Sequence, residues 1–182
     1  MSQSEKHDII LVVNGTKQAV SVESRSLLCD VLRRDLGLVG VHTGCEHGVC
    51  GACTVRIDGK SARSCITLAV QVDGSRVDTV EGLANGTALH PVQEAFWRCN
   101  GLQCGFCTPG MLMRVTEFLE TNSNPTREEA REAIASNLCR CTGYQHIVDS
   151  VMEAAGRLRG EEWSAKAGVP ASELRNAAKE TQ

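Results

Sequence analysis

The chain has 182 residues, of which 19 are basic and 22 acidic, so that its net charge is −3. The two signs are well mixed, which argues against the clustered basic face of a nucleic-acid-binding protein, and no apolar run approaches the length needed to span a bilayer. The polar residues 1–8 lack the apolar core of a secretory signal. We therefore expect a cytoplasmic protein, in which ten cysteines are better explained by metal than by disulfides.

The first domain is predicted over residues 1–84 and is rich in β-structure. Asn14-Gly15 follows a short apolar run and is a strong hairpin signal. The residues after it alternate polar and apolar, as a half-buried strand does, and Asp58-Gly59 marks a second tight turn. The strands predicted around these two turns are residues 9–13, 17–22, 54–57 and 60–64.

A helix and a loop are predicted between the two hairpins. Ser26 is placed to cap a helix over residues 27–35, and a glycine-punctuated loop over residues 37–51 carries two cysteines and leads directly to a third, Cys53. The order of strand, strand, helix, cysteine loop and hairpin is that of a β-grasp ferredoxin. The expected fold class is therefore α+β, with this domain followed by a helical one.

The second domain is predicted over residues 85–160. Thr108 is expected to cap a helix that has Pro109 at its first position, and Thr126 with Glu129 forms a capping box for the next helix. Four helices around one metal site would make a small bundle. The predicted helices are residues 91–100, 108–121, 127–137 and 144–158, and residues 161–182 are expected to form a polar surface tail.

The first group of cysteines has the spacing of a known cluster type. Cys45, Cys50 and Cys53 form a C-x4-C-x2-C run that Cys65 completes, as in plant-type ferredoxins, where four thiolates hold two irons. Zinc motifs usually combine two close pairs of ligands, so the spacing favours a 2Fe–2S cluster. His47 lies inside the loop and is expected to be a surface side chain, because four cysteines already complete the set.

The second group is less specific in its spacing. Cys104 and Cys107 form a C-x2-C pair, and Cys139 and Cys141 form a C-x-C pair further along the chain. This pattern leaves a 2Fe–2S cluster and a zinc ion equally open. The helix predicted to begin beside Cys107 directs the positive end of its dipole toward the thiolates and favours their charge.

The segments GCEHGVCGAC, QCGFCTPGM and NLCRCTGY together resemble the small iron–sulfur subunit of the molybdenum hydroxylases, the xanthine oxidase family. The resemblance covers residues 8–157 and implies a plant-type ferredoxin domain followed by a four-helix bundle, with one 2Fe–2S cluster in each. It also implies that Gln103 matches a position that hydrogen-bonds the pterin in relatives. The ligand sets that it implies are Cys45, Cys50, Cys53 and Cys65 for one cluster, and Cys104, Cys107, Cys139 and Cys141 for the other.

The resemblance further implies partners and a direction. A large subunit would carry the molybdenum–pterin cofactor, expected in its cytosine dinucleotide form, and a medium subunit would carry FAD. The whole complex would be a dimer of heterotrimers. Electrons would run from molybdenum through the Cys104 set and then the Cys45 set to flavin or another acceptor. The chain would thus be the electron-transfer subunit of an oxidoreductase acting on an N-heteroaromatic compound or an aldehyde, with no catalytic residue of its own.

Three other functions stay open at this point. The chain could be the small subunit of a carbon monoxide dehydrogenase, a free-standing ferredoxin that docks transiently, or a zinc-stabilised interaction module without a redox role. Each makes a different prediction for the metal content and for the subunits that copurify.

Several residues near the motifs have simpler interpretations. Cys29 and Cys99 belong to neither set and are expected to be buried thiols that pack in the core. Arg140 is interpreted equally well as a cation that stabilises a reduced cluster or as a solvated side chain. Phe106 is expected to pack over the cluster or in the core, and His42 has no visible partner and is assigned no chemistry.

Overall fold

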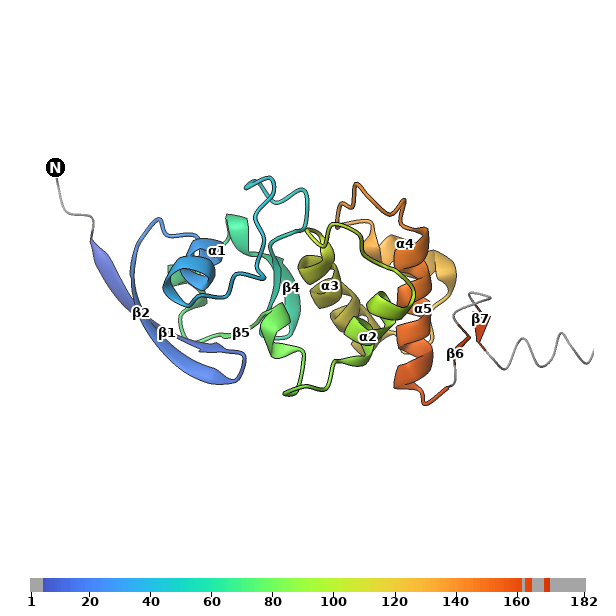
Figure 1. Ribbon diagram of the computed structural model, residues 1–182. Helices are drawn as coiled ribbons and strands as arrows, with labels where there is room; N and C mark the ends of the chain where they lie inside the picture. The colour runs from blue at the N-terminus through green and yellow to red at the C-terminus, as the bar shows by residue number, and fades with distance from the viewer. Residues whose placement is uncertain (1–4, 162, 165–168, 171–182) are drawn as a thin grey trace, which may run out of the picture.

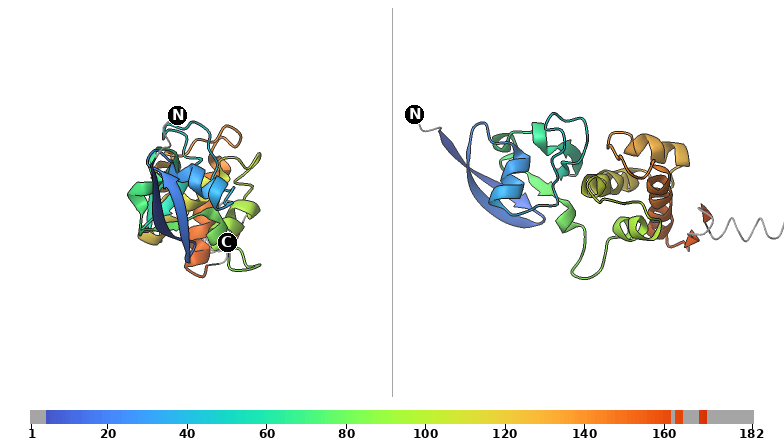
Figure 2. Two further views of the ribbon diagram at one scale, coloured as in Figure 1. Left: turned by 90° about the vertical axis from the view of Figure 1, so that its left-hand side faces the viewer. Right: turned by 45° about the horizontal axis from the view of Figure 1, so that its top comes forward.

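The computed structural model describes residues 5–161, 163–164 and 169–170 (Figure 1). The chain folds into two units that lie side by side, one built on a sheet and one built from helices (Figure 2). The tail predicted over residues 161–182 lies outside the described residues, apart from Glu161 and two short paired strands, β6 (Trp163–Ser164) and β7 (Val169–Pro170).

The first unit contains a mixed five-stranded sheet in the order β2-β1-β5-β3-β4. Asn14 and Gly15 adopt positive φ between the first two strands, and Asp58 and Gly59 do so between β3 and β4, as two-residue hairpin turns of type I′ require. Both predicted hairpins are therefore confirmed. The strands are β1 (Lys6–Val13), β2 (Thr16–Glu23), β3 (Thr54–Ile57), β4 (Lys60–Arg63) and β5 (Arg76–Asp78).

One short helix packs on this sheet. It comprises α1 (Leu28–Asp30) and a π-helical turn, η1 (Val31–Asp35), so that it ends where the sequence predicted. The predicted cap is wrong: the Ser26 hydroxyl accepts a hydrogen bond from the Glu23 amide (3.1 Å), because Ser26 still belongs to the turn that leaves β2. The buried core of this unit includes Leu11, Leu28, Leu32, Val55 and Val77. The 3-10 turns of the chain are η2 (Ser64–Ile66), η3 (Ala69–Val72) and η4 (Val80–Gly82) within the described residues.

The second unit consists of four helices, which confirms the predicted bundle. The capping box is also confirmed, since the Thr126 hydroxyl accepts from the Glu129 amide (3.2 Å) and the Glu129 carboxylate accepts from the Thr126 amide (2.7 Å). Thr108 is not a cap: it is the first residue of its helix, and its buried hydroxyl has no hydrogen-bond partner among the described residues. The helices are α2 (Pro91–Arg98), α3 (Thr108–Thr121), α4 (Arg127–Ile134) and α5 (Gln145–Leu158).

The two units have separate cores but share a packed interface. The core of the helical unit includes Phe96, Met111, Ile134, Ile147 and Val151, and α3 packs against β3 and β4. Across this interface the Arg56 guanidinium donates two hydrogen bonds to the Glu120 carboxylate (2.7 and 2.5 Å). The boundary between residues 84 and 85 stays a prediction. None of the helices in the described ranges is long and apolar enough to span a membrane.

Candidate metal centres

The eight predicted ligands lie on loops and short turns. The segments over residues 41–50 and 138–144 rise on the same side of the molecule, at the top in Figure 1 and in the right-hand view of Figure 2. All ten cysteines lie within the described ranges, and none of them forms a disulfide.

The first cysteine loop (residues 45–53) aims backbone donors at sulfur. The Cys50 amide donates to Cys45 Sγ (3.3 Å), and amide hydrogen bonds, first from Cys50 and then from His47, lower the pKa of Cys45 to about 6. Burial, followed by a hydrogen bond with the Cys53 thiol, instead raises the pKa of Cys65 to about 12. A bound metal cation would offset the cost of that burial by stabilising the thiolate. The set thus combines accessible and buried sulfurs around one loop.

Two glycines of this loop have positions that no other residue would fill without strain. Gly48 (φ 83°) and Gly51 (φ 77°) both lie in the left-handed region. A Cβ at Gly48 would lie 2.8 Å from Ile66 Cδ1, and one at Gly51 would lie 2.6 Å from Asn137 Cγ. These glycines allow the loop to curl so that the Cys50 amide reaches Cys45 Sγ.

The second set has an exposed pair of thiols and a half-buried pair. Cys104 and Cys141 are exposed, with their sulfurs 3.5 Å apart, and a hydrogen bond from the Phe106 amide lowers the pKa of Cys104. Cys107 and Cys139 are half-buried. Burial, and next a hydrogen bond with the Cys139 thiol, raises the pKa of Cys107 to about 12. The outer pair therefore faces solvent and the inner pair faces the protein.

Cys139 is held by two neighbours in its own turn. Burial opposes its ionisation, but hydrogen bonds from the Thr142 hydroxyl and amide lower the pKa of Cys139; the Cys139 Sγ to Thr142 Oγ1 distance is 3.2 Å. The Cys139 amide donates to the Tyr144 hydroxyl (2.8 Å). Tyr144 thus supports the backbone of a predicted ligand.

The thiols fit a two-iron group better than a single ion. A 2Fe–2S cluster distributes four thiolates over two irons, whereas zinc needs four donors around one point. The sulfurs lie instead as neighbouring pairs, which are Cys45 with Cys50, Cys53 with Cys65, Cys104 with Cys141, and Cys107 with Cys139.

The two cysteines outside the sets are buried, as predicted. Cys29 is 2 % exposed and belongs to the core of the first unit, where burial raises its pKa to about 11. Cys99 donates from its sulfur to the buried Glu153 carboxylate (2.7 Å), and burial raises its pKa to about 12. Cys99 therefore packs against a buried carboxyl group, which no pattern in the sequence predicted.

The remaining predicted residues are found at the surface near the two loops. The His47 side chain is exposed and its Nδ1 contacts the Cys45 carbonyl, which agrees with its interpretation as a surface residue. Gln103 and Arg140 are exposed beside Cys104 and Cys141. The pterin contact of Gln103 and the eight ligand assignments stay predictions.

Further contacts join the cysteine-bearing segments of the two units, and the sequence interpretation missed them. The His42 ring stacks on Phe106 with ring centroids 4.9 Å apart, and its Nδ1 lies 2.8 Å from the Phe106 carbonyl oxygen. A further contact involves Asn137, in the segment before Cys139, which bonds to the Gly51 carbonyl of the first cysteine loop and to Arg63 of β4. Asn137 stands within the motif NLCRCTGY and could have been singled out there, whereas nothing in the sequence pointed to His42 or Arg63.

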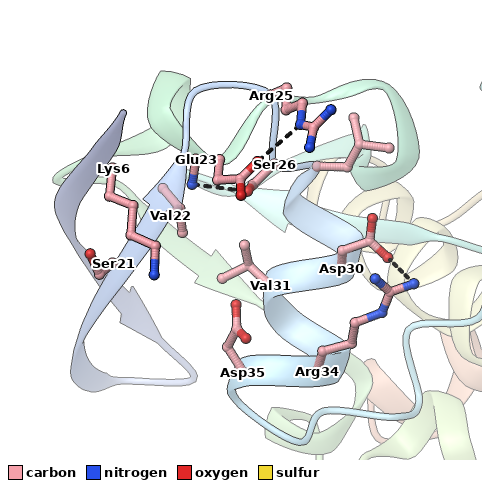
Figure 3. Close-up of a pocket in the computed structure, with 11 residues that line it drawn as sticks. Lys6, Ser21, Val22, Glu23, Arg25, Ser26, Asp30, Val31, Arg34 and Asp35 are labelled. Carbon is pink, nitrogen blue, oxygen red and sulfur yellow. Dashed lines mark hydrogen bonds and ion pairs between the residues drawn. The ribbon is translucent and has the colours of Figure 1, made fainter. Parts of the chain in front are cut away.

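A groove between β2 and α1 is not a second candidate site (Figure 3). None of the eight predicted ligands lines it. Its charged side chains neutralise one another, since Arg25 pairs with Glu23 (2.9 Å) and Arg34 with Asp30 (3.3 Å). Such exposed pairs are ordinary features of a protein surface.

Comparisons with known proteins agree with this geometry. Residues 11–89 match the 2Fe-2S iron-sulfur cluster binding domain, and residues 79–152 match a second 2Fe-2S binding domain. The chain is 55 % identical over 157 residues to the nicotine 6-hydroxylase small subunit of Paenarthrobacter nicotinovorans, covering 86 % of this chain and 94 % of that one.

Two further relatives support the same grouping. The caffeine dehydrogenase subunit gamma of Pseudomonas sp. (strain CBB1) is 51 % identical over 148 residues, covering 80 % of this chain and 89 % of the relative. The crystal structure of quinoline 2-oxidoreductase from Pseudomonas putida 86 superposes with a TM-score of 0.82 at 47 % identity, covering 86 % of this chain and 99 % of the matched one.

Proposed function

The chain belongs to the small iron–sulfur subunits of the molybdenum hydroxylases, and we propose that it relays electrons from a molybdenum–pterin site on a large subunit to an acceptor. The observation that carries the proposal is the arrangement of eight thiols as four pairs in two adjoining domains. The chain is an oxidoreductase subunit whose substrate chemistry takes place on its partner.

We assign one 2Fe–2S cluster to each cysteine set. Each cluster, when bound, supplies a centre that takes up and releases one electron. The paired thiolates would hold the two irons of each cluster, and the amides of the first loop would donate to sulfur and raise the reduction potential. The assigned ligands are Cys45, Cys50, Cys53 and Cys65 in the first domain, and Cys104, Cys107, Cys139 and Cys141 in the second.

Exposure supports a direction for the relay. Cys104 and Cys141 are the exposed thiols of the second set, and Gln103 is exposed beside them, so this surface is accessible to a large subunit that holds a molybdenum–pterin cofactor in its cytosine dinucleotide form. The first set would then pass electrons toward FAD on a medium subunit. Val49 in the first cysteine loop and Ile66 beside it are 59 % and 60 % exposed and offer an apolar surface to such a partner. The proposed assembly is a dimer of such heterotrimers.

The names of the relatives point to a substrate class. Nicotine, caffeine and quinoline, which occur in three of those names, are N-heteroaromatic compounds, and we propose this class for the complex. Aldehydes are the second candidate, because an aldehyde oxidoreductase of Megalodesulfovibrio gigas is 46 % identical over 155 residues. A reducing cytoplasm is the proposed location, since ten free thiols suit it.

The metal content of the purified full-length chain tests the proposal. We expect a coloured protein with broad visible absorption and about two irons and two sulfides for each cluster. A colourless protein loaded with zinc would refute the redox function. Copurification with larger subunits separates the proposed relay from a free-standing ferredoxin.

The order of the two clusters is tested in the purified complex. In the Cys104→Ser variant, substrate is expected to reduce both clusters more slowly than in the wild type. In the Cys45→Ser variant, substrate is expected still to reduce the cluster of the second set, while transfer onward to the acceptor is blocked. If substrate still reduced the first set at the wild-type rate in the Cys104→Ser variant, the proposed order would be wrong.

A further inference from the structure

The segment before Cys139 lies directly on the first cysteine loop. Ser136, Asn137 and Leu138 connect α4 to Cys139, and the Leu138 amide donates to the Cys50 carbonyl (2.8 Å). One assigned ligand of each set is therefore linked to the other through Leu138 and a single hydrogen bond. Because this link is made by backbone atoms, its length depends on how firmly the segment is held.

Asn137 holds the segment from inside the interface. Its side chain is buried, with 1 % exposed, and its Nδ2 donates to the Gly51 carbonyl (2.9 Å) and the Thr54 hydroxyl (3.3 Å). Its Oδ1 accepts from Arg63 (3.3 Å) and from the Ser136 hydroxyl (3.1 Å). A buried amide group with both its donor and its acceptor atoms paired specifies one orientation.

Arg63 holds the same segment from β4. Its guanidinium donates to the Ser136 carbonyl (2.6 Å), to Asn137 Oδ1 and to the Thr54 hydroxyl. Hydrogen bonds from a charged donor are stronger than those between neutral groups. The close fit of Gly51 against Asn137 leaves no room for a side chain between them, so the contact has one register.

We infer that Asn137 and Arg63 are positioning residues that keep Cys139 of one ligand set at a fixed separation from Cys50 of the other. The inference rests on the proposed function, because a fixed separation matters when two clusters exchange electrons and the exchange rate falls steeply with distance. A side chain that only stabilised the fold would affect unfolding and leave the mutual arrangement of the clusters unchanged.

The test uses the full-length chain with both clusters bound. After complete reduction, the magnetic interaction between the two paramagnetic clusters is measured as the splitting of their electron paramagnetic resonance signals, with iron content checked for each sample. Asn137→Ala is expected to abolish or weaken the splitting. Arg63→Gln, a change at a half-buried residue, is expected to weaken it. Both variants should keep the wild-type iron content.

Arg56→Gln is the matched control. It removes the ion pair with Glu120, which also joins the two units, and the hydrogen bond of the Arg56 guanidinium to the Gly59 carbonyl in the β3–β4 turn; neither partner belongs to a cysteine loop, and the variant should keep the wild-type splitting. Wild-type splitting in both Asn137→Ala and Arg63→Gln would overturn the inference, and so would an equal loss in Arg56→Gln. If Asn137→Ala fails to fold, Arg63→Gln against Arg56→Gln decides. A wild-type chain that binds no iron would instead overturn the proposed function.

Discussion

Replacing Gly110 with alanine probes how closely α3 lies on the first cysteine loop. Gly110 stands in the first turn of α3, and a Cβ at this position would lie 2.2 Å from the Gly51 carbonyl oxygen and 3.0 Å from that of Ala52. Both atoms belong to the backbone of the loop. The added methyl group therefore cannot be accommodated by rotating a flexible side chain, and either the helix or the loop has to move.

The magnitude follows from two opposing effects. Alanine favours a helix over glycine by about 1 kcal/mol, whereas adding a methyl group to a well-packed site costs about 1–3 kcal/mol, occasionally more. The Cβ contact at 2.2 Å is far shorter than the 3.0 Å that real Cβ atoms keep, which places the steric cost at or above the upper end. A net loss of about 2 kcal/mol lowers the Tm of a chain of this size by roughly 4–8 °C.

Thermal unfolding followed by circular dichroism measures this loss, and the visible spectrum reports on the clusters. Gly110→Ala is expected to change both, because the displaced loop carries assigned ligands. Gly86→Ala is the control: the positive φ of Gly86 (60°) strains an alanine, but its Cβ would meet nothing within 4 Å, so the variant should alter the Tm alone. A Gly110→Ala protein as stable as the wild type, with an unchanged spectrum, would refute the close contact.

Three further predictions concern stability. Glu153 is fully buried between Arg157 (2.8 Å) and the Cys99 thiol, so Glu153→Ala should cost about 3 kcal/mol in denaturant unfolding; a cost near zero would contradict this. Hydrogen bonds from the Thr126 amide and hydroxyl lower the pKa of Glu129, so its stabilising effect is present above the ordinary carboxyl pKa and is lost as pH falls through the lowered one. Glu129→Gln should therefore flatten the acid side of the Tm–pH profile, and an unchanged slope would count against the capping box. Removing both clusters with a chelator should lower the Tm, because metal binding is coupled to folding; an unchanged Tm would argue that the sites fold without metal.

Local signals in the sequence predicted most of the fold. The turn at Asn14-Gly15 and the capping box of Thr126 and Glu129 were correct because each involves residues a few positions apart. The caps expected at Ser26 and Thr108 were wrong because the surroundings of a hydroxyl depend on the whole fold. Ser26 bonds back into the preceding turn, while the buried Thr108 hydroxyl has no hydrogen-bond partner among the described residues. A spacing rule cannot predict which of these environments tertiary structure imposes.

In the candidate site too, local spacing predicts some features, while others arise only when the chain folds. Spacing grouped Cys45 with Cys50 and Cys104 with Cys107, but the pair Cys104 and Cys141 is close only after folding. Asn137 lies beside Gly51 through the packing of two domains. Contacts between residues so far apart in the chain depend on how the loops dock, and no local pattern encodes that.

The burial of the first set indicates where its electrons leave. Cys53 and Cys65 are 1 % and 2 % exposed and form part of the core of the first unit, so no partner approaches them directly. Cys45 and Cys50 are half-buried, and Cys50 is bonded through its carbonyl to the segment before Cys139. In the proposed relay, electrons arriving along that contact would therefore meet the accessible pair, and an acceptor would dock on the same loop beside Cys45 and not through the sheet.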